Sequence, residues 1–597
     1  MPHPRAPELM GSGGWIGTGE SLTLAALRGK VVVLHFWAFG NALALRTIEE
    51  LRPIEQRYPN TMVVVGVHSP KFPHEADHEA VELAAARHQI THLLLDDPDL
   101  VTWQQYGVKG WPTLVVIAPT GRVTGLINGA DDLTLLSEVV SDQIAESTRW
   151  GILDDAPTLK LPPRPPDGPL AFPSKLATDW HGRLAIADTG HDRVVIAELA
   201  EDLRRPTRDD PQGAAVPARI TDLITGLHRP QGVCFDGDRV IICDTGADRV
   251  LRVDLAELVA DEHGIGRLRA SDDHLLREPI GAPWDVTMDL DGSYVVAEAA
   301  FNRLWRIRED GTEAGIIAGT GVAGIHDGRA SHAELAQPTG LARLPNYLAF
   351  CDSDTSALRV LSDRGKVSTI VGEGSFDWGF RDGMTGAARL QHPTDVCASP
   401  DGSTIYVADT YNSAIRFWRG RRLSTLPTEG LKQPGGIENL GDGRLIVADT
   451  NNHRVVLVDT DSGTVTPLRF EFRPVAPVPI NPRAGDPVIA GAGESTRVYF
   501  EVDLEGRYLD PAEETPVQLK IDADPSWLLA EHAPLYWEHG AVTGSFTIPT
   551  GLAGRGTLTV SVAAAACGDG ISTVVRSVRQ HPLVVEPAQS WAELSEP

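Results

Sequence analysis

Short runs of alternating apolar and polar residues fill the middle of the chain and recur as similar units. Each unit begins near a proline, continues as a short apolar strand, turns, and ends a second strand on an acidic residue. A repeat of roughly 50 residues built from short strands is typical of a propeller blade. Six copies therefore predict a six-bladed all-β propeller over residues 172–472. The acidic anchors that end the second strands are Asp188, Asp244, Glu298, Asp352, Asp409 and Asp449.

The first 150 residues show a different pattern. Val31–Trp37 is a continuous apolar run, as expected of a strand buried on both faces. Apolar residues at three- and four-residue steps then predict a helix over 44–57. The further expected elements are a strand at 62–67, a helix near 75–88, a hairpin of 113–117 with 125–127, and a helix at 133–144. This order predicts an α/β domain over 1–150.

Three stretches of this domain resemble the thioredoxin fold of the redoxin type. They are Phe36–Phe39, the hairpin turn Thr120–Arg122, and Trp111–Thr113, which resembles the family's cis-proline segment. Active members carry Cys-x-x-Cys after the first stretch, whereas Asn41–Ala44 holds no cysteine. Thiol–disulfide exchange needs an activated thiolate and a second thiol. We therefore expect no exchange chemistry at this site.

Two interpretations of the altered thioredoxin site remain open. In the first, the domain is kept for packing or docking. In the second, a groove still binds an extended peptide, because backbone beside such a proline can pair with a strand. The residues of that groove are Trp37, Asn41, Ala44, Trp111 and Pro112. Asn41 also suits the N-cap of the following helix.

The propeller units resemble NHL repeats, and the fullest match is Asp449–Arg454. A carboxylate at the end of one strand and a guanidinium at the start of the next can clamp the hairpin. We therefore expect the acidic anchors to be structural, although a ring of them at one mouth of the channel would also suit a cationic ligand. Two copies depart from the pattern, since Ala357 and Ala414 stand where the others have arginine.

Two copies carry long insertions, at 319–337 and 372–392. Long loops on one face of a propeller commonly form its interaction surface. We therefore expect a protein or peptide partner to bind there. The candidate residues are His326, Asp327, Phe376, Trp378, Phe380 and Asp382.

The propeller is flanked by two further regions. A proline-rich linker at 151–171 is expected to be an extended, semi-rigid spacer. After the propeller, alternation with period two predicts a C-terminal β-sandwich over 473–590, and residues 591–597 form an acidic tail.

Composition narrows the classes of function. A net charge of −28 argues against nucleic acid or an anionic membrane surface as the partner. No apolar run is long enough for a signal peptide or a membrane-spanning helix, and five scattered cysteines do not describe a disulfide framework. A reducing cytoplasm is therefore expected. The histidines follow no ligand pattern, so we expect no metal and no cofactor.

The order of domains resembles the NHL-repeat-containing protein 2-like family. The leading hypothesis is a non-catalytic interaction scaffold, with a redox-inactive thioredoxin-like domain docked to the propeller. The alternative is an enzyme, either an oxidoreductase that works through partner thiols or a propeller hydrolase or lyase. The sequence indicates neither the identity of the partner nor the oligomeric state.

Overall fold

The computed structural model describes residues 3–18, 21–129, 133–157, 168–179, 182–199, 215–260, 266–269, 275–276, 279–472, 483–484, 488–491, 495–501, 508–509, 517–524, 543–549, 554–568 and 571–586. The chain forms two compact units, Met1–Leu258 with Leu268–Phe472, and Val259–Arg267 with Arg473–Pro597. Residues 158–167 of the expected linker and the acidic tail lie outside the described residues.

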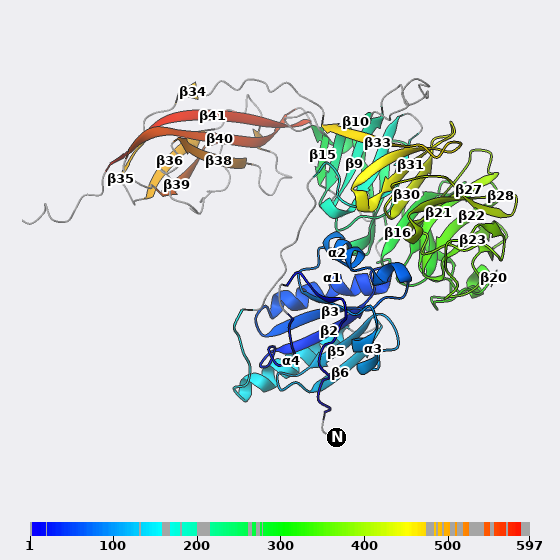
Figure 1. Cartoon of the computed structure of the whole chain (residues 1–597). Coiled ribbons are helices and arrows are strands. Elements are labelled where there is room, and N and C mark those ends of the chain that lie inside the picture. The colour runs from blue at the N-terminus through cyan, green and yellow to red at the C-terminus, as the bar shows by residue number, and fades with distance from the viewer. Residues whose placement is uncertain are drawn as a thin grey trace, which may run out of the picture. The chain divides into compact units, whose positions relative to one another are not determined.

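The first unit opens with an α/β domain, coloured blue to cyan in Figure 1. Its six-stranded sheet has the order β1-β4-β3-β2-β5-β6. The strands are β1 (Gly14–Ile16), β2 (Val31–Trp37), β3 (Met62–His68), β4 (Leu93–Asp96), β5 (Thr113–Ile117) and β6 (Val123–Asn128). The helices are α1 (Ala42–Arg57), α2 (His78–Arg87), α3 (Val101–Gln105) and α4 (Leu133–Arg149). The thioredoxin-like domain expected from the sequence is confirmed, and β1, β4 and α3 add to the expected elements.

The apolar run of β2 is buried on both faces, which is why it lacks polar alternation. On one face Val33 packs with Leu51 of α1 and Leu136 of α4. On the other face Phe36 packs near Trp103 of α3. This central strand ends directly before the altered thioredoxin site, so the position of the site is set by the core of the domain.

Six antiparallel blades follow, and the expected propeller is confirmed. The first strands are β7 (Pro173–Thr178), β11 (Val233–Asp236), β16 (Pro283–Met288), β21 (Pro338–Leu344), β26 (Asp395–Ala398) and β30 (Pro434–Asn439). The second strands are β8 (Arg183–Asp188), β12 (Arg239–Asp244), β17 (Tyr294–Glu298), β22 (Tyr347–Asp352), β27 (Thr404–Asp409) and β31 (Arg444–Asp449). The third strands are β9 (Arg193–Leu199), β13 (Arg249–Asp254), β18 (Arg303–Ile307), β23 (Ala357–Ser362), β28 (Ala414–Arg419) and β32 (Arg454–Asp459).

Five of the blades have a fourth strand among the described residues. These strands are β10 (Val216–Thr225), β19 (Ala314–Ala318), β24 (Lys366–Val371), β29 (Arg422–Thr425) and β33 (Val465–Phe472). The insertions add β20 (Gly328–Arg329), which pairs with β24, and β25 (Gly383–Met384), which pairs with β29. Both insertions are therefore tied to the outer edges of the fourth and fifth blades.

Hydrogen bonds from side-chain hydroxyl groups join neighbouring blades. In five blades the residue after the anchor donates a hydrogen bond to the carbonyl of the next blade's first proline. The donors are Thr189, Thr245, Ser353, Thr410 and Thr450. The bond from Thr450 to Pro173, at 2.7 Å, joins the sixth blade to the first. At the rim, β33 and β10 pair in parallel and close the ring a second time.

The described residues of the second unit form two sheets. The six-stranded sheet comprises β34 (Arg483–Ala484), β35 (Val488–Gly491), β37 (Tyr508–Leu509), β38 (Val517–Asp524), β40 (Gly554–Gly568) and β41 (Ile571–Glu586). The two-stranded sheet comprises β36 (Ser495–Glu501) and β39 (Thr543–Pro549). The short strands β14 (Val259–Ala260) and β15 (Gly266–Arg269) pair with each other. Across the described part of the chain, no helix combines the length and apolar character needed to cross a membrane.

Candidate functional site

The altered thioredoxin site lies at the N-terminal end of α1. Asn41 has an extended backbone, and its side chain accepts a hydrogen bond from the Ala44 amide at 2.8 Å. The expected N-cap role of Asn41 is confirmed. Ala42 and Ala44 are fully buried. The site therefore offers neither a thiol nor an open approach to its last position.

The propeller covers this site. Gln337, in the loop before β21, accepts a hydrogen bond from the Ala42 amide at 2.8 Å and donates one to the Gly40 carbonyl at 2.7 Å. Its carboxamide therefore pairs with the backbone in both directions, as a neighbouring strand would. In Figure 1, α1 and α2 lie on the side of the domain that meets the propeller.

Glu75 holds the backbone beside the site. One of its oxygens accepts hydrogen bonds from the Gly40 amide at 3.0 Å and from the Tyr411 hydroxyl of the propeller at 3.1 Å. The other accepts from the amides of Lys71 and Phe72. Burial raises the pKa of this carboxyl group. A side chain at Gly40 would overlap both Tyr411 and Glu75, so the close approach of the two domains requires glycine there.

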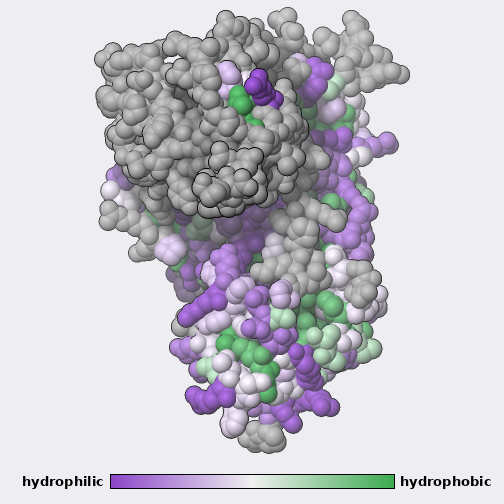
Figure 2. All heavy atoms as spheres, turned by 90° about the vertical axis from the view of Figure 1, so that its left-hand side faces the viewer, coloured by the Kyte–Doolittle hydropathy of each residue, from purple (hydrophilic) through white to green (hydrophobic). Residues whose placement is uncertain are grey.

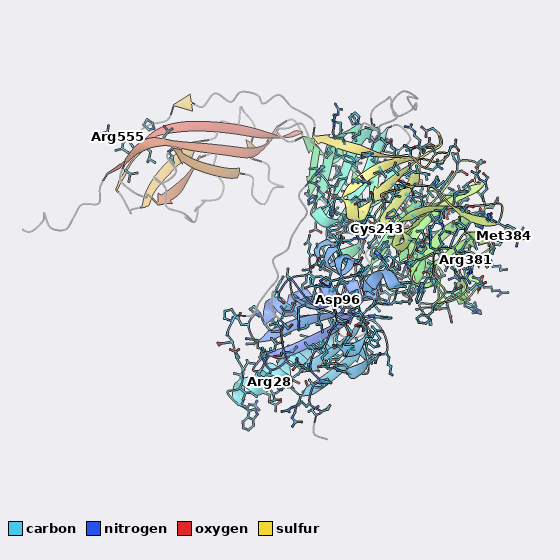
Figure 3. All side chains as sticks on the ribbon, viewed as in Figure 1. Arg28, Asp96, Cys243, Arg381, Met384 and Arg555 are labelled. Carbon is cyan, nitrogen blue, oxygen red and sulfur yellow. The ribbon has the colours of Figure 1, made fainter. Side chains whose placement is uncertain are left out.

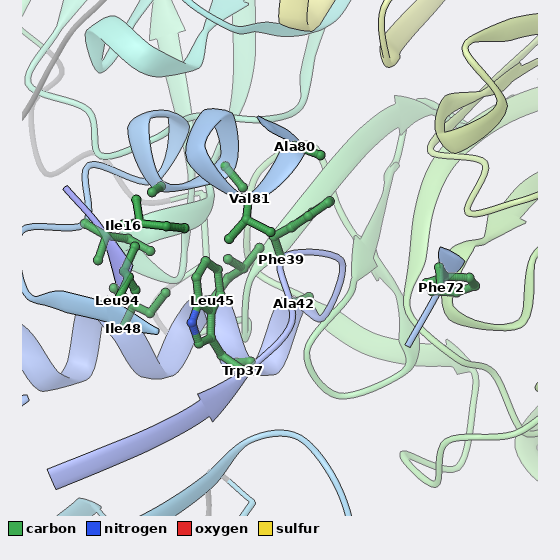
Figure 4. Close-up of a cluster of buried hydrophobic side chains, with 14 of the residues drawn as sticks. Ile16, Trp37, Phe39, Ala42, Leu45, Ile48, Phe72, Ala80, Val81 and Leu94 are labelled. Atoms are coloured by element: carbon green, nitrogen blue, oxygen red, sulfur yellow. The ribbon is translucent and has the colours of Figure 1, made fainter. Parts of the chain in front are cut away.

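Aromatic rings from both domains pack around Glu75. Phe72 lies 5.0 Å from Trp378 and 5.5 Å from Tyr411, measured between ring centroids. Phe39 lies 5.7 Å from Tyr411. Figure 4 shows Phe39 and Leu45 close to Trp37, while Phe72 stands on a separate loop among the propeller ribbons. The two domains thus share one apolar cluster at this point.

Ion pairs surround the shared cluster. Glu49 of α1 binds Arg229 at 2.8 Å and also binds His228. Burial would raise the pKa of Glu49, but the hydrogen bond from His228 and the charges of Arg229 and Arg52 lower it to about 2. Three further ion pairs join the two domains: Arg46–Asp248, Lys71–Asp354 and Lys432–Glu79. Several paired charges around an apolar centre are typical of a specific interface.

The other residues of the predicted groove lie at the rim or in the core of the thioredoxin-like domain. The peptide bond between Trp111 and Pro112 is cis, so the expected cis-proline segment is confirmed. The Trp111 indole donates to the Ser69 carbonyl at 2.8 Å and packs beside Trp103. Trp37 is fully buried. The structure therefore leaves Trp111 partly exposed but removes Trp37 and Ala44 from any surface that a peptide could reach.

The acidic anchors of the propeller are all buried and paired. In the first, second and sixth blades the carboxylate binds the arginine five residues later at 2.7 Å, and its other oxygen accepts a backbone amide from the loop before the blade. These pairs are Asp188–Arg193, Asp244–Arg249 and Asp449–Arg454. In the third blade Glu298 accepts from the Trp305 indole at 2.8 Å. The expected clamps between anchor and arginine are present in these hairpins. The anchor carboxylates are therefore already bound to groups of the propeller itself.

The two blades that lack arginine at the usual place still have a clamp, which corrects the expectation from the repeat pattern. Arg359 binds Asp352 at 2.7 Å, and Arg416 binds Asp409 at 2.7 Å. Each arginine lies seven residues after its anchor instead of five. Side chains alternate along a strand, so a shift of two residues keeps the guanidinium on the same face.

Each of the two insertions supplies a carboxylate that binds one of these shifted arginines. Asp327 binds Arg359 at 3.0 Å, and Asp382 binds Arg416 at 2.6 Å. Both arginine side chains are fully buried, so each needs the second carboxylate for its remaining donors. Asp327 and Asp382, predicted as partner residues, therefore have structural partners within the chain. The same holds for Trp378, which packs on Phe72.

Other residues of the insertions remain exposed. Phe376 is 76% and Phe380 60% exposed, and Met384 of the same loop is half exposed. Figure 3 places Met384 and Arg381 at the outer side of the propeller. His326 pairs through its backbone with Glu334. On the face shown in Figure 2, hydrophobic residues of the thioredoxin-like domain occur in small groups among hydrophilic ones.

The centre of the propeller contains charged residues that were not singled out from the sequence. Lys175 lies in the channel and binds Asp395 at 2.7 Å. Asp285 and Asp395 each accept a backbone amide from the next blade, from Leu341 and Ile437. Lys175, Asp285 and Asp395 all lie two residues after the repeat's proline, in the first, third and fifth blades. This shared position was the signal that could have revealed them.

Glycine occupies the same position in the alternate blades: Gly232, Gly340 and Gly436. A side chain at Gly232 would lie 2.6 Å from the Asp285 Cα atom, and one at Gly340 would lie 2.5 Å from the Asp395 Cα atom. The alternation therefore lets neighbouring first strands approach closely around the channel.

Burial controls the charge in this channel. It raises the pKa of Asp285 to about 7, and Asp395 adds to the shift while Lys175 opposes it. Burial also raises the pKa of Glu438 to about 8, with further contributions from Asp395 and Asp285. Lys175 therefore balances Asp285 and Asp395, and these two acids and Glu438 cannot all ionise easily at neutral pH.

The four cysteines in the propeller are free thiols. Cys243 and Cys351 are fully buried in second strands, where burial raises their pKa well above the usual value. Figure 3 shows Cys243 inside the propeller. They therefore behave as small apolar strand residues. Within the described residues, no group of three or more His, Cys, Asp or Glu side chains is placed to hold a metal ion.

Known proteins were compared with this chain. No protein-family model matches it. NHL repeat-containing protein 2 from Gallus gallus is 28% identical over 589 residues, covering 89% of this chain and 80% of the relative. The protein of the same name from Homo sapiens is 29% identical, covering 76% of this chain and 70% of the relative. The predicted resemblance to the NHL-repeat-containing protein 2-like family is confirmed.

Among solved structures, a thioredoxin-like protein in its oxidised form is similar to part of this chain. It is 25% identical and covers 24% of this chain and 97% of its own, with a TM-score of 0.23. The resemblance to the NHL-repeat-containing protein 2-like family covers most of the chain.

Proposed function

We propose that this NHL repeat protein is a non-catalytic interaction scaffold, in which the thioredoxin-like domain is fixed to the propeller through its own altered site. One observation carries the proposal. The segment from Gly40 to Ala42 is bound on both its carbonyl and its amide by Gln337 of the propeller. The surface that an active thioredoxin presents to its substrate is used here for an internal contact.

The arrangement supports this proposal over an oxidoreductase. Exchange requires an accessible thiolate, and positions 41 and 44 hold asparagine and a fully buried alanine. Burial raises the pKa of the propeller thiols and so disfavours the thiolate. The same cover disfavours a bound peptide at Trp37 and Ala44. The cytoplasmic location stays a prediction.

The proposed partner is a protein that contacts the exposed part of the fifth-blade insertion. Phe376, Phe380 and Met384 are large apolar side chains that the fold leaves in solvent. Exposed aromatic and methionine side chains are enriched at protein interfaces. Phe380 also lies over the Arg416 guanidinium at 4.8 Å, which orients the ring.

The experiment has two arms, both with the full-length chain. In the first, reduction of insulin disulfides is measured, and we expect no turnover above the uncatalysed rate. In the second, bound proteins are captured from lysate with the wild type and with a Phe376→Ser, Met384→Ser double variant. We expect specific proteins to be lost from the double variant. A Leu290→Ser variant is the matched control, because Leu290 is 70% exposed on another blade.

Catalysed insulin reduction would overturn the non-catalytic part of the proposal. Equal capture by the double variant and the Leu290→Ser control would overturn the choice of surface. The two arms therefore fail separately.

A further inference from the structure

A small cavity lies between the thioredoxin-like domain and the mouth of the propeller channel. Its volume is about 40 Å³, and Arg87 of α2, Ser174, His392, Thr394 and Thr410 contribute to its lining. A site needs about 10–15 Å³ for each water molecule. The space therefore suits a group of only a few heavy atoms, enclosed by both domains.

Arg87 is the residue that makes this cavity unusual. Its guanidinium Nε is buried and has no hydrogen-bond partner. One terminal nitrogen lies at a long 3.5 Å from Gln231 Oε1. Among the described ion pairs none includes Arg87, whereas Arg46 and Arg229 at the same interface each bind a carboxylate. A buried guanidinium without an anion is costly, so the missing partner needs an explanation.

The surroundings of Arg87 hold a second polar group without a partner and no acidic side chain. His392 is buried, and its ring Nδ1 has no partner. Burial, together with the charges of Lys71, His74 and Arg87, lowers the pKa of His392 to about 3. The residues that line the cavity include hydroxyls and amides but no aspartate or glutamate. The positive potential is therefore not balanced within the lining.

We propose that this cavity binds a small oxyanion, such as inorganic phosphate, through the guanidinium of Arg87. The planar fork of an arginine matches two oxygens of such an anion. The ring Nδ1 of His392 is a further polar atom of the lining without a partner. The hydroxyls of Ser174, Thr394 and Thr410 already donate to Gln231, Gly435 and Pro434, so the charge of Arg87 carries the binding. The enclosure by two domains limits the ligand to a free anion rather than a group on a larger molecule.

The anion would join the two domains. Arg87 belongs to α2, whereas Ser174 lies in the first strand of the first blade and Thr394 directly precedes the first strand of the fifth. A ligand that contacts both sides binds only the docked state, and so it stabilises that state in proportion to its concentration. This inference does not depend on the scaffold proposal, because an enzyme with the same docked domains would have the same cavity.

Titration calorimetry and thermal unfolding of the full-length chain test the proposal, with inorganic phosphate as the probe and ionic strength held constant. We expect saturable heat at one site and an unfolding temperature that rises with phosphate. Sulfate should compete, and acetate should bind more weakly. Absence of both heat and stabilisation up to millimolar phosphate would overturn the proposal without any variant.

Variants locate the site. Arg87→Gln should weaken phosphate binding about tenfold or more, since a charged hydrogen-bonding partner is lost. Arg87→Lys should give an intermediate affinity, and it serves as well if the glutamine variant fails to fold. Arg46→Gln is the control, because it removes an interface arginine that already has a carboxylate. Phosphate binding unchanged by both Arg87 variants would place the anion elsewhere.

Discussion

Two regions of this molecule have lost a residue that their repeat or family pattern contains, with opposite results. At Asn41 and Ala44 the motif cysteines are absent, and no other thiol occupies their place. At Ala357 and Ala414 the clamp arginine is absent, yet Arg359 and Arg416 bring a guanidinium to the same carboxylates. The first difference leaves the motif positions without a thiol, whereas the second only moves a guanidinium along its strand.

The difference teaches what a missing motif residue means. A strand can supply the same group from two residues further along, because alternate side chains share a face. A nucleophile at a helix N-terminus has no such substitute, because neighbouring positions on a helix point in other directions. A gap in a strand motif should therefore be checked at the next position on the same face before a function is considered lost.

The largest expected effect on stability comes from removing an arginine that binds a propeller anchor. Arg416→Met leaves Asp409 and Asp382 without their cation, and Asp409 is buried. We expect a loss of about 3–5 kcal/mol in the free energy of unfolding, measured by urea denaturation.

Arg454→Met is the control for the clamp. This arginine binds its anchor from the usual position, but its side chain is 35% exposed. We expect a smaller loss, about 1–2 kcal/mol. Equal losses in the two variants would mean that the shifted arginine contributes no more to the stability of its blade than an arginine at the usual position.

The next largest expected effect on stability comes from removing the contact that covers the altered thioredoxin site. Gln337→Leu leaves the Ala42 amide and the Gly40 carbonyl without partners, which should cost about 1–3 kcal/mol. We expect faster hydrogen exchange at residues 40–45. Gln89→Leu is the control, since Gln89 reaches the propeller only through longer contacts at 3.3 and 3.4 Å. Exchange as slow as in the wild type would show that Gln337 does not hold the site closed.

A smaller effect is expected from removing a hydrogen bond that joins two blades. Thr450→Val removes the hydroxyl that joins the sixth blade to the first, and we expect a loss of about 1 kcal/mol in urea denaturation. Thr460→Val removes a similar bond to Gly443 on the exposed surface and should cost less. If the two variants are equally stable, ring closure rests on the pairing of β33 with β10 instead.

The smallest expected effect concerns pH. The pKa of Glu438 rises on folding from 4.5 to about 8, so the folded protein binds this proton more tightly than the unfolded chain. The associated stabilisation is complete at low pH and is lost as the pH rises towards 8. Glu438→Gln should flatten this decline by on the order of 1 kcal/mol, measured as unfolding temperature from pH 5 to 8. Glu309→Gln, on an exposed side chain, should leave the decline unchanged.

Much of the fold could be predicted from the sequence because its signals are local. The Pro-to-Asp repeat fixes each hairpin, and the apolar run Val31–Trp37 identifies the central strand. The cap formed by Asn41 follows from three neighbouring residues. Each of these depends on contacts within a few residues of one another.

The interface could not be predicted in the same way. Gln337 and Ala42 are 295 residues apart, and no sequence pattern links the two. Glu75 and Tyr411 are equally remote in sequence. By contrast, Arg359 and the channel residues could have been found, because both repeat at fixed distances from a proline or an anchor. What the sequence hides is which surfaces meet.

The alternation of charged residues and glycine around the channel restricts how such a ring can change in size. Gly232 and Gly340 are small because Asp285 and Asp395 lie against them in the next blade. A duplication or deletion of a single blade would put two glycines or two charged strands side by side. Gain or loss of a matched pair of blades would preserve the alternation. The unit that could be added or removed without breaking this alternation is therefore a pair of blades, although the sequence repeat corresponds to a single blade.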